Sequence, residues 1–575
     1  MRRAIRIRLR VLSTLLFLFA FLLITRLYFV QVVDAAEYQL RAEKQYMSSS
    51  QELFDRGSIY LTRKDGSLLS AATLATGFTV AMRPSDIEDA ETAYAALSAQ
   101  VAIDKEAFLA SAARIDDPYE VVAKRVSEDA GKAIEALEIP GIRLERERWR
   151  SYPAKTQAAQ SIGFVAYDND NDLAGRIGLE RYYEDALSRK NEGLFGNFFA
   201  ELFANLDSVV VDAREAREGD LITTIDPVVQ EKLDQVIASV NAQYGSLETG
   251  AIIMDPKTGE IIALDTYPSF DLNDFANGNP AHFGNPLVES RYEFGSIVKA
   301  LTMAAGLDAG AVTPDSTYND TGCRTLNEKT FCNYDLKARG VIPMQEILSQ
   351  SLNVGAAYVA LAVGRERFRE YFKELGMGEE TGIDLPSEIP GTIANIEKSP
   401  RDIEYATASY GQGIAQTPVE MVKALGALAN GGEVVTPHLV RAIRLESGIE
   451  RELAWGESSR VFSKKAVEET TRMLVKVADT KIANGAKKIP EMTVAAKTGT
   501  AQVPGPGGQY YANLYFHSFF GYFPAYEPRY IILLYTRQPQ GVQYASETLT
   551  EPFFELTHFL INYYSIPPDR AGYED

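Results

Sequence analysis

Cysteine and histidine, the usual side chains of metal and redox sites, are scarce in this sequence. It has two cysteines and four histidines, and no histidine stands in a recognisable catalytic-triad setting. The motifs Cys-x-x-Cys, His-Glu-x-x-His and Gly-x-x-x-x-Gly-Lys-Ser/Thr are absent, which removes the common redox, zinc-protease and phosphate-loop signatures. The Gly-x-Ser-x-Gly nucleophile elbow is absent as well. We therefore expect neither a metal nor a cofactor.

The two cysteines, Cys323 and Cys332, lie close together in the sequence. Outside the cytoplasm such a pair can form a disulfide that closes a short loop. Two free thiols are the alternative, and the sequence leaves both open.

Positive charge is also in short supply, with 58 Lys and Arg against 78 Asp and Glu and a net charge of -20. Such an excess of negative charge argues against nucleic acid, or an anionic membrane surface, as the main partner. The apolar fraction of 46% and the charged fraction of 24% are normal for a globular protein. The length of 575 residues is enough for two or three domains.

The N-terminus carries a membrane signal. Five arginines within residues 1–10 precede the uncharged run Val11–Thr25, which continues after Arg26 to Val33. Residues 11–33 are long enough to span a bilayer, and the arginines place residues 1–10 in the cytoplasm. A signal peptide cleaved near Val33-Asp34-Ala35 is the alternative, although the apolar run is longer than a usual signal core.

Turn and cap signals divide the first half of the remaining chain. Asp65-Gly66 predicts a hairpin between two short strands, and helices are expected over Asp89–Ala99 and Lys105–Ala113. Glycines bracket Leu179 and Glu180 within Gly175–Tyr183, which indicates tight packing or a chain crossing, with an ordinary loop leading into a helix as the alternative.

The second large domain opens at Leu221–Pro227, where Asp226-Pro227 caps a helix. Strands are expected over Gly250–Asp255, Glu260–Thr266, Val494–Ala501, Ser518–Phe523 and Tyr530–Tyr535, and the block between them is helical to about Leu428. This order predicts an α+β domain with helices packed on an antiparallel sheet.

The stretch around Ser296 carries the first candidate chemistry. The apolar run after Gly295 predicts a helix buried on all sides, and Ser296 and Lys299 share one face because residues at i and i+3 do so. Burial lowers the pKa of a lysine, and a neutral lysine can take the proton of a serine nucleophile. The alternative is a lysine that extends to solvent beside an N-capping serine. Ser296 is the only serine that precedes a lysine by three positions.

Two further motifs follow in the chain. Ser351-Leu352-Asn353 lies between two predicted helices, where the hydroxyl could pass a proton and the amide could hold a substrate amide; helix capping is the alternative. Lys497-Thr498-Gly499-Thr500 lies on a predicted edge strand, where the missing side chain of Gly499 would let a ligand approach the backbone. Each motif has a copy elsewhere, Ser239-Val240-Asn241 within a helix and Lys257-Thr258-Gly259 in a hairpin turn, so neither is specific alone.

The ordered set Ser-x-x-Lys, Ser-x-Asn and Lys-Thr-Gly resembles the penicillin-binding proteins and serine β-lactamases. Flanking stretches narrow the resemblance to class B penicillin-binding proteins; they are the hairpin from Arg56, Arg150–Pro153, Gly175–Tyr183, Leu221–Asp226 and Ser409–Ile414. The resemblance covers nearly the whole chain past residue 33. Phe294 departs from the family, which usually has proline before Gly-Ser, and we expect it to alter the approach to the helix and not the chemistry.

The resemblance implies a monofunctional peptidoglycan D,D-transpeptidase. Ser296 would attack the D-Ala-D-Ala carbonyl of a stem peptide, Lys299 would take its proton, and Ser351 with Lys497 would return a proton to the leaving D-Ala. The remaining implied roles are donor binding by Asn353, carboxylate binding by Thr498 and Thr500 beside Gly499, and an oxyanion hole from the backbone N–H groups of Ser296 and Thr500. Penicillin would acylate Ser296.

The resemblance also implies a domain plan and a cellular setting. Residues 34–215 would form a non-catalytic, dimerisation-like pedestal, residues 216–568 the transpeptidase domain, and residues 569–575 a C-terminal tail. The protein would be a single-pass protein of the cytoplasmic membrane, with its catalytic domain outside. Expected partners are stem peptides, β-lactams, a membrane-embedded glycan polymerase and other division proteins.

Other functions share these motifs. An elongation-type class B transpeptidase is one, although Ser409–Ile414 and Gly163–Leu179 look more like the division type. A D,D-carboxypeptidase and a β-lactam-hydrolysing enzyme are disfavoured by the predicted pedestal and anchor. A β-lactam sensor or inactive scaffold is disfavoured by the short cytoplasmic part and the intact Ser296, Lys299 and Lys497.

Overall fold

The computed structural model describes residues 55–167, 173–189, 218–445, 447–505, 507 and 509–570. The described residues form two compact units, of which unit 1 holds Asp55 and Thr76–Trp149, and unit 2 holds the rest. The predicted anchor over residues 11–33 and the tail 1–10 lie outside this description. Across the ranges that are described, no helix combines the length and the apolar character that crossing a bilayer requires.

Unit 1 is a small sheet covered by helices. Its strands are the second half of β2 (Leu68–Met82), β3 (Glu120–Ser127) and β4 (Ile142–Ser151), with β3 and β4 both paired to β2. Its helices are α3 (Ala90–Ser98), α4 (Lys105–Ala112) and α5 (Glu128–Glu135). Asp89 and Asp104 cap the first two by accepting bonds from first-turn N–H groups, which confirms both expected helices. Phe108, Leu97 and Val126 belong to its core.

Unit 2 begins with the predicted hairpin. The strand β1 (Ile59–Thr62) pairs antiparallel with the start of β2 around Asp65-Gly66, which confirms the hairpin. On its other side β1 pairs in parallel with β7 (Gly219–Thr223), and β15 (Val440–Leu445) and β16 (Glu450–Glu452) extend the sheet.

A buried ion cluster joins distant stretches of unit 2 near this sheet. Arg56 Nε and Arg150 Nε each donate to the carboxylate of Glu180 at 2.6 Å, and the Glu180 side chain is fully buried. Glu180 lies in α7 (Gly178–Tyr182), where a Cβ on Gly178 would sit 2.4 Å from Ser161 O. The glycine-bracketed stretch is therefore a close chain crossing, as one of the two sequence interpretations had it.

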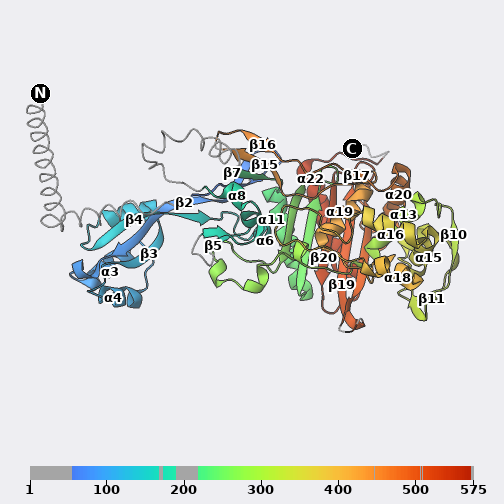
Figure 1. Ribbon diagram of the computed structural model, residues 1–575, viewed down its shortest axis with the longest axis horizontal. Helices are drawn as coiled ribbons and strands as arrows, with labels where there is room; N and C mark the ends of the chain where they lie inside the picture. Colours follow the sequence, from blue (N-terminus) through green and yellow to red (C-terminus); the bar gives the residue numbers. More distant parts are fainter. Residues whose placement is uncertain are drawn as a thin grey trace, which may run out of the picture. The chain divides into compact units, whose positions relative to one another are not determined.

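A five-stranded antiparallel sheet forms the centre of unit 2 (Figure 1). Its strands, in spatial order, are β18 (Ala495–Pro504), β19 (Tyr510–Phe523), β20 (Tyr530–Arg537), β8 (Glu248–Met254) and β9 (Ile261–Tyr267). All seven residues from Tyr530 to Thr536 are buried, although side chains alternate between the faces of a strand. Both faces of the sheet are therefore covered, which confirms the predicted α+β fold.

Two groups of helices cover the sheet. The helices α11 (Pro227–Tyr244) and α22 (Thr550–Tyr564) pack together and contact β8, β9 and β19. The helices α19 (Pro418–Ala429) and α20 (Lys464–Thr480) contact β8, β18 and β20, and α13 (Lys299–Asp308) packs on both. Asp226 caps α11 as predicted, with Pro227 at its first position.

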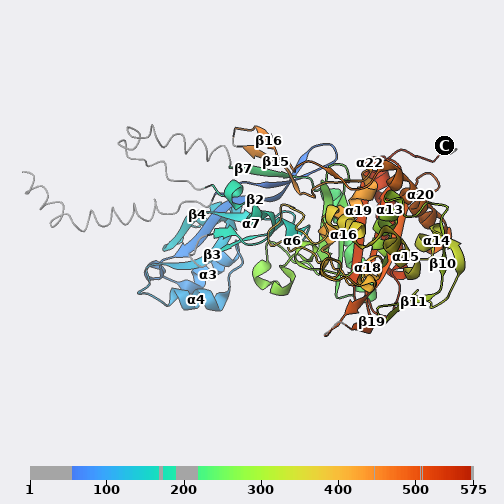
Figure 2. The same ribbon diagram turned by 45° about the vertical axis from the view of Figure 1, so that its right-hand side comes forward.

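The block between β9 and β18 is largely helical. It contains α14 (Gln345–Ser349), α15 (Asn353–Val363), α16 (Arg365–Glu374) and α18 (Asp402–Ala408). Beside α15 lie two small antiparallel sheets of two strands each, β10 (Thr317–Asp320) with β13 (Gly340–Pro343) and β11 (Cys323–Leu326) with β12 (Lys329–Cys332). Both views show β10 and β11 near α15 (Figures 1 and 2). Cys323 and Cys332 face each other across β11 and β12 and form a disulfide.

The remaining short elements connect these larger ones. They are α6 (Ala159–Ile162), α8 (Glu184–Leu187), α12 (Pro286–Glu289), α17 (Ala394–Lys398), α21 (Ala545–Thr548), β5 (Val165–Tyr167), β6 (Leu173–Gly175), β14 (Glu433–Val434) and β17 (Ser459–Arg460), with 3₁₀ turns at Pro84–Asp86, Phe275–Asn277, Pro280–His282, Gly295–Val298 and Ile482–Gly485.

Candidate functional site

Ser296 and Lys299 lie on one continuous helical segment. Ser296 belongs to the 3₁₀ turn η5 (Gly295–Val298), and Lys299 is the first residue of α13. Every residue from Lys299 to Gly306 is buried, so the helix is enclosed as predicted. Lys299 is only 1% exposed, and its Nζ donates to Ser296 Oγ at 2.9 Å. The lysine therefore does not extend to solvent, and the two side chains meet.

Ser351 lies in the turn between α14 and α15 and meets both buried lysines. Its Oγ accepts from Lys299 Nζ at 3.2 Å and from Lys497 Nζ at 3.1 Å. Its carbonyl oxygen accepts from Lys299 Nζ at 2.7 Å. The φ angle of Ser351 is +54°, in the left-handed region that a serine rarely adopts. Surrounding contacts must hold this backbone, and such strain is typical of functional turns.

Burial sets the protonation of the two lysines. Desolvation, with a smaller effect of the nearby Lys497, holds the pKa of Lys299 well below its usual value. Burial lowers the pKa of Lys497 to about 7. Both shifts have the same physical cause, because an ammonium group loses hydration when it is enclosed by protein. A neutral Lys299 amine in contact with Ser296 can accept the hydroxyl proton.

The strand β18 presents the Lys-Thr-Gly motif at the end of the sheet, as predicted. Lys497 is 2% exposed, whereas Thr498 and Thr500 are half-buried and lie on the opposite face of the strand. Lys497 Nζ also donates to Thr498 O at 2.8 Å. Thr500 Oγ1 accepts from Ala545 N at 3.0 Å and keeps its own hydrogen for a ligand.

The reason for glycine at position 499 differs from the one expected. A Cβ on Gly499 would lie 2.3 Å from Ser518 Oγ and 2.5 Å from Phe294 O. The protein interior therefore occupies the space, and no ligand could approach on that side. Gly499 lets β18 lie against the chain just before Ser296, because any side chain would force the two apart.

Asn353 begins α15 beside Ser351, and its Nδ2 donates to Cys332 O at 2.9 Å. The disulfide hairpin and the Ser-x-Asn turn are thus bonded directly. The two copies of the motifs lie elsewhere: Ser239-Val240-Asn241 is inside α11, and Lys257-Thr258-Gly259 is in the turn between β8 and β9 with Thr258 exposed.

Several residues behind the nucleophile were not singled out from the sequence. Tyr410 is 4% exposed, and its ring centroid lies 6.0 Å from Lys299 Nζ. The carboxylate of Glu293 accepts from Gly413 N at 3.0 Å and from Tyr510 Oη at 2.9 Å. Burial raises the pKa of Glu293 to about 7. Their only signal in the sequence was indirect, the glycine-rich stretch Ser409–Ile414, because these contacts join segments far apart in the chain.

Phe294 fits the position where the family usually has proline. Its φ of -81° is close to the value that proline imposes, so this angle does not show the altered approach to the helix that the sequence led us to expect. The ring packs edge-on against Phe516, and its carbonyl accepts from Ser518 Oγ at 2.7 Å.

Known proteins resemble this chain along most of its length. The family model for the penicillin binding protein transpeptidase domain matches residues 249–556, and that for the penicillin-binding protein dimerisation domain matches residues 54–193. Stage V sporulation protein D of Bacillus subtilis is 27% identical over 559 residues, which cover 95% of this chain and 84% of that protein. Peptidoglycan D,D-transpeptidase FtsI of Escherichia coli is 25% identical over 435 residues, which cover 75% of this chain and 70% of that protein.

Solved structures share the fold. Penicillin binding protein 3 of Mycobacterium tuberculosis, solved in complex with aztreonam, has a TM-score of 0.67 at 22% identity, covering 90% of this chain and 98% of that one.

The transpeptidase family model alone matches more than half of the 575 residues. The chain therefore belongs to the penicillin-binding protein transpeptidase family, as a class B member, and is a serine-type D-Ala-D-Ala transpeptidase.

Proposed function

We propose that this protein cross-links peptidoglycan stem peptides through an acyl-enzyme on Ser296. The observation that carries the proposal is the position of Lys299 Nζ, 2.9 Å from Ser296 Oγ and 3.2 Å from Ser351 Oγ. A neutral amine in that position takes the proton of Ser296 as its oxygen attacks the carbonyl carbon of the D-Ala-D-Ala bond.

The leaving group needs a proton, and Ser351 is the donor that the site offers. Its hydroxyl hands a proton to the nitrogen of the departing D-Ala and regains one from Lys299, which had taken it from Ser296, while Lys497 stays bonded to the same oxygen. The terminal carboxylate of the donor peptide binds to the hydroxyls of Thr498 and Thr500, and Lys497 supplies the nearby charge because its Nζ turns to Thr498 O, at 2.8 Å. Backbone N–H groups of Ser296 and Thr500 stabilise the oxyanion.

The second half of the reaction transfers the acyl group. An amine of a neighbouring stem attacks the ester on Ser296 and loses a proton to Lys299, and Lys299 gives that proton to Ser296 Oγ as the serine leaves. Asn353 holds the donor peptide by its amide, in place of the bond it makes to Cys332 O in the free enzyme. Penicillin follows the first half of the same path and stays on Ser296, so the protein is a target of β-lactams.

Mass spectrometry of the penicillin adduct tests this assignment. The full-length protein in detergent is incubated with benzylpenicillin, digested, and the modified peptide is sequenced. We expect one adduct, on Ser296. An adduct on Ser351, or no adduct at all, would refute the proposal.

We further propose a role in septal wall synthesis, with the protein held by a membrane anchor over residues 11–33. The residues from Ser409 to Ile414 and from Gly163 to Leu179 support the division type over the elongation type. Residues 34–215 serve as the pedestal that meets a membrane-embedded glycan polymerase and other division proteins. Depletion of the protein in its own cells should give filaments with unfinished septa, whereas round cells would favour the elongation type.

A further inference from the structure

The strained turn at Ser351 is bonded on both sides to one other segment, residues 320–339. Before the turn, Gln350 Oε1 accepts from Arg339 Nε at 3.0 Å. After it, Asn353 Nδ2 donates to Cys332 O at 2.9 Å, and Val354 N donates to Asn333 Oδ1 at 3.1 Å. The left-handed Ser351 is therefore held between two anchor points on a single segment.

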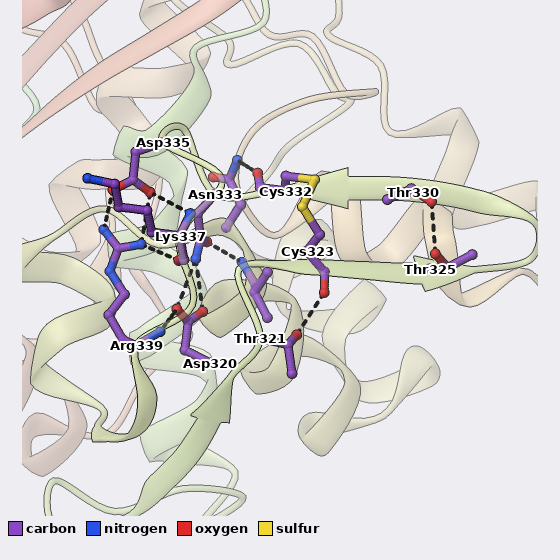
Figure 3. Close-up of a disulfide and its surroundings, with 12 residues drawn as sticks. Asp320, Thr321, Cys323, Thr325, Thr330, Cys332, Asn333, Asp335, Lys337 and Arg339 are labelled. Carbon is purple, nitrogen blue, oxygen red and sulfur yellow. Dashed lines mark hydrogen bonds and ion pairs between the residues drawn. A yellow bond between two sulfur atoms is a disulfide. The ribbon is translucent and has the colours of Figure 1, made fainter.

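That segment is itself tied together at its base (Figure 3). Asn333 Nδ2 donates to both oxygens of the Asp320 carboxylate, at 2.9 and 3.1 Å, and both side chains are 1% exposed. The same carboxylate accepts from Arg339 N at 3.0 Å. The disulfide between Cys323 and Cys332 closes the hairpin one residue before Asn333. The amide nitrogen of Asn333 is therefore bonded to Asp320, and its amide oxygen accepts from Val354 N in α15.

We propose that Asn333, oriented by Asp320, is a positioning residue that holds the Ser351 turn in its catalytic geometry. The inference rests on the proposed function, since it assigns Asn333 a part in the acylation of Ser296. The side-chain hydrogen bonds of Asn333 go to Asp320 and Val354 and not to the nucleophile or either lysine, so it acts through Val354 and the backbone that leads to Ser351. Without it, Ser351 can relax from its left-handed conformation, and its hydroxyl moves away from Lys299 and Lys497.

The effect should fall on the chemical step more than on binding. The carboxylate of a penicillin would bind to β18, and no hydrogen bond joins residues 320–339 to the described residues of that strand, so the dissociation constant K should change little. The acylation rate constant k2 depends on proton delivery by Ser351, and a misplacement of about 1 Å can cost roughly 100-fold in rate. We expect Asn333→Ala to lower k2 roughly 10-fold to 100-fold at nearly constant K.

A purely structural role for Asn333 predicts a different result. It would lower the melting temperature and the fraction of protein that titrates with penicillin, and leave k2 of the titratable fraction unchanged. The measurement is therefore stopped-flow acylation of the full-length protein by a fluorescent penicillin, with k2 and K separated by varying its concentration. Active-site titration gives the functional fraction in each preparation.

An exchange of the two partners provides the rescue. In Asp320→Asn/Asn333→Asp, the carboxylate at position 333 still accepts from Val354 N. The amide nitrogen at position 320 donates to that carboxylate, and the amide oxygen at position 320 accepts from Arg339 N. Asn333→Asp alone places two carboxylates together in the interior. We expect k2 of the exchanged pair to return to within about three-fold of the wild type, and Asn333→Asp to stay low, as coupled partners do in a double-mutant cycle. Failure of the exchange to restore k2 would overturn the assignment.

The chain supplies a matched control and a second route. Thr325 and Thr330 bond to each other at 2.8 Å in the same hairpin and are exposed, so Thr325→Val/Thr330→Val should leave k2 unchanged. If Asn333→Ala does not fold, Gln350→Leu provides the test, because it removes the bond to Arg339 and leaves the buried pair of Asp320 and Asn333 intact. An unchanged k2 in Gln350→Leu would overturn the proposal. Wild-type protein that penicillin does not acylate would refute the proposed function itself, whereas acylated wild type with unaltered variants would refute only the role of Asn333.

Discussion

Lys299 and Lys497 converge on one hydroxyl: their Nζ atoms lie 3.2 and 3.1 Å from Ser351 Oγ. Lys299 lies at the start of α13, and Lys497 lies on β18, the edge strand of the five-stranded sheet. Two enclosed ammonium groups this close repel each other and lack hydration, so the arrangement favours at least one neutral amine. A base for Ser296 and a cation for the substrate carboxylate can therefore coexist in one site.

The two lysines should respond differently to substitution. Lys299→Ala removes the base next to Ser296, and general-base help is worth roughly 100-fold to 10,000-fold, so acylation by penicillin should nearly vanish. Lys497→Arg keeps a cation near Ser351 and should retain part of the rate. Acylation time courses on titrated protein measure both, and equal losses would mean that the roles are not divided in this way.

Acylation should depend on pH through both amines. Because burial lowers the pKa of Lys299, its amine stays neutral to lower pH than an ordinary lysine does, and k2/K should fall as acidification protonates it. Burial lowers the pKa of Lys497 to about 7, so this lysine loses its charge as pH rises and k2/K should fall again on the alkaline side. Arginine stays protonated, so Lys497→Arg should lose the alkaline fall. An alkaline fall that persists in this variant would assign it to another group.

The two Lys-Thr-Gly copies give a test of the cleft. Thr498 is half-buried on β18, whereas Thr258 is exposed in the turn after β8. Thr498→Val should slow acylation severely without unfolding the protein, because a lost bond to a charged carboxylate costs roughly 1.5–3 kcal/mol. Thr258→Val should keep the rate within a few-fold of wild type. Comparable damage at equal melting temperature would place the cleft elsewhere.

Glu180 should matter for stability. Its buried carboxylate faces Arg56 and Arg150, whose side chains are 1% and 4% exposed. Glu180→Gln leaves buried guanidinium groups short of a partner, and breaking a buried pair costs about 3–5 kcal/mol. Denaturant unfolding should show this loss, and Glu184→Gln, at a side chain that is 33% exposed, should lose clearly less. Similar losses in the two variants would contradict the buried-pair account.

The sequence was enough wherever the physical signal is local. Asp89 and Asp226 mark helix starts because a capping carboxylate needs only the next turn of backbone. The hairpin at Asp65-Gly66 follows from the φ that its glycine adopts. Ser296 and Lys299 were predicted to meet because three residues separate them on one helical segment, and their bond of 2.9 Å agrees.

Only the tertiary structure decided contacts between segments far apart in the chain. Lys497 reaches Ser351 because β18 and the α14–α15 turn pack beside α13, and the spacing of residues in the sequence does not predict that packing. Gly499 illustrates the same limit: its missing side chain was predicted to make room for a ligand, but atoms of Phe294 and Ser518 occupy that space. The anchoring of Ser351 by Asn333 and Arg339 had no sequence signal, since a hydrogen bond depends on where a fold brings two groups and not on their spacing in the chain.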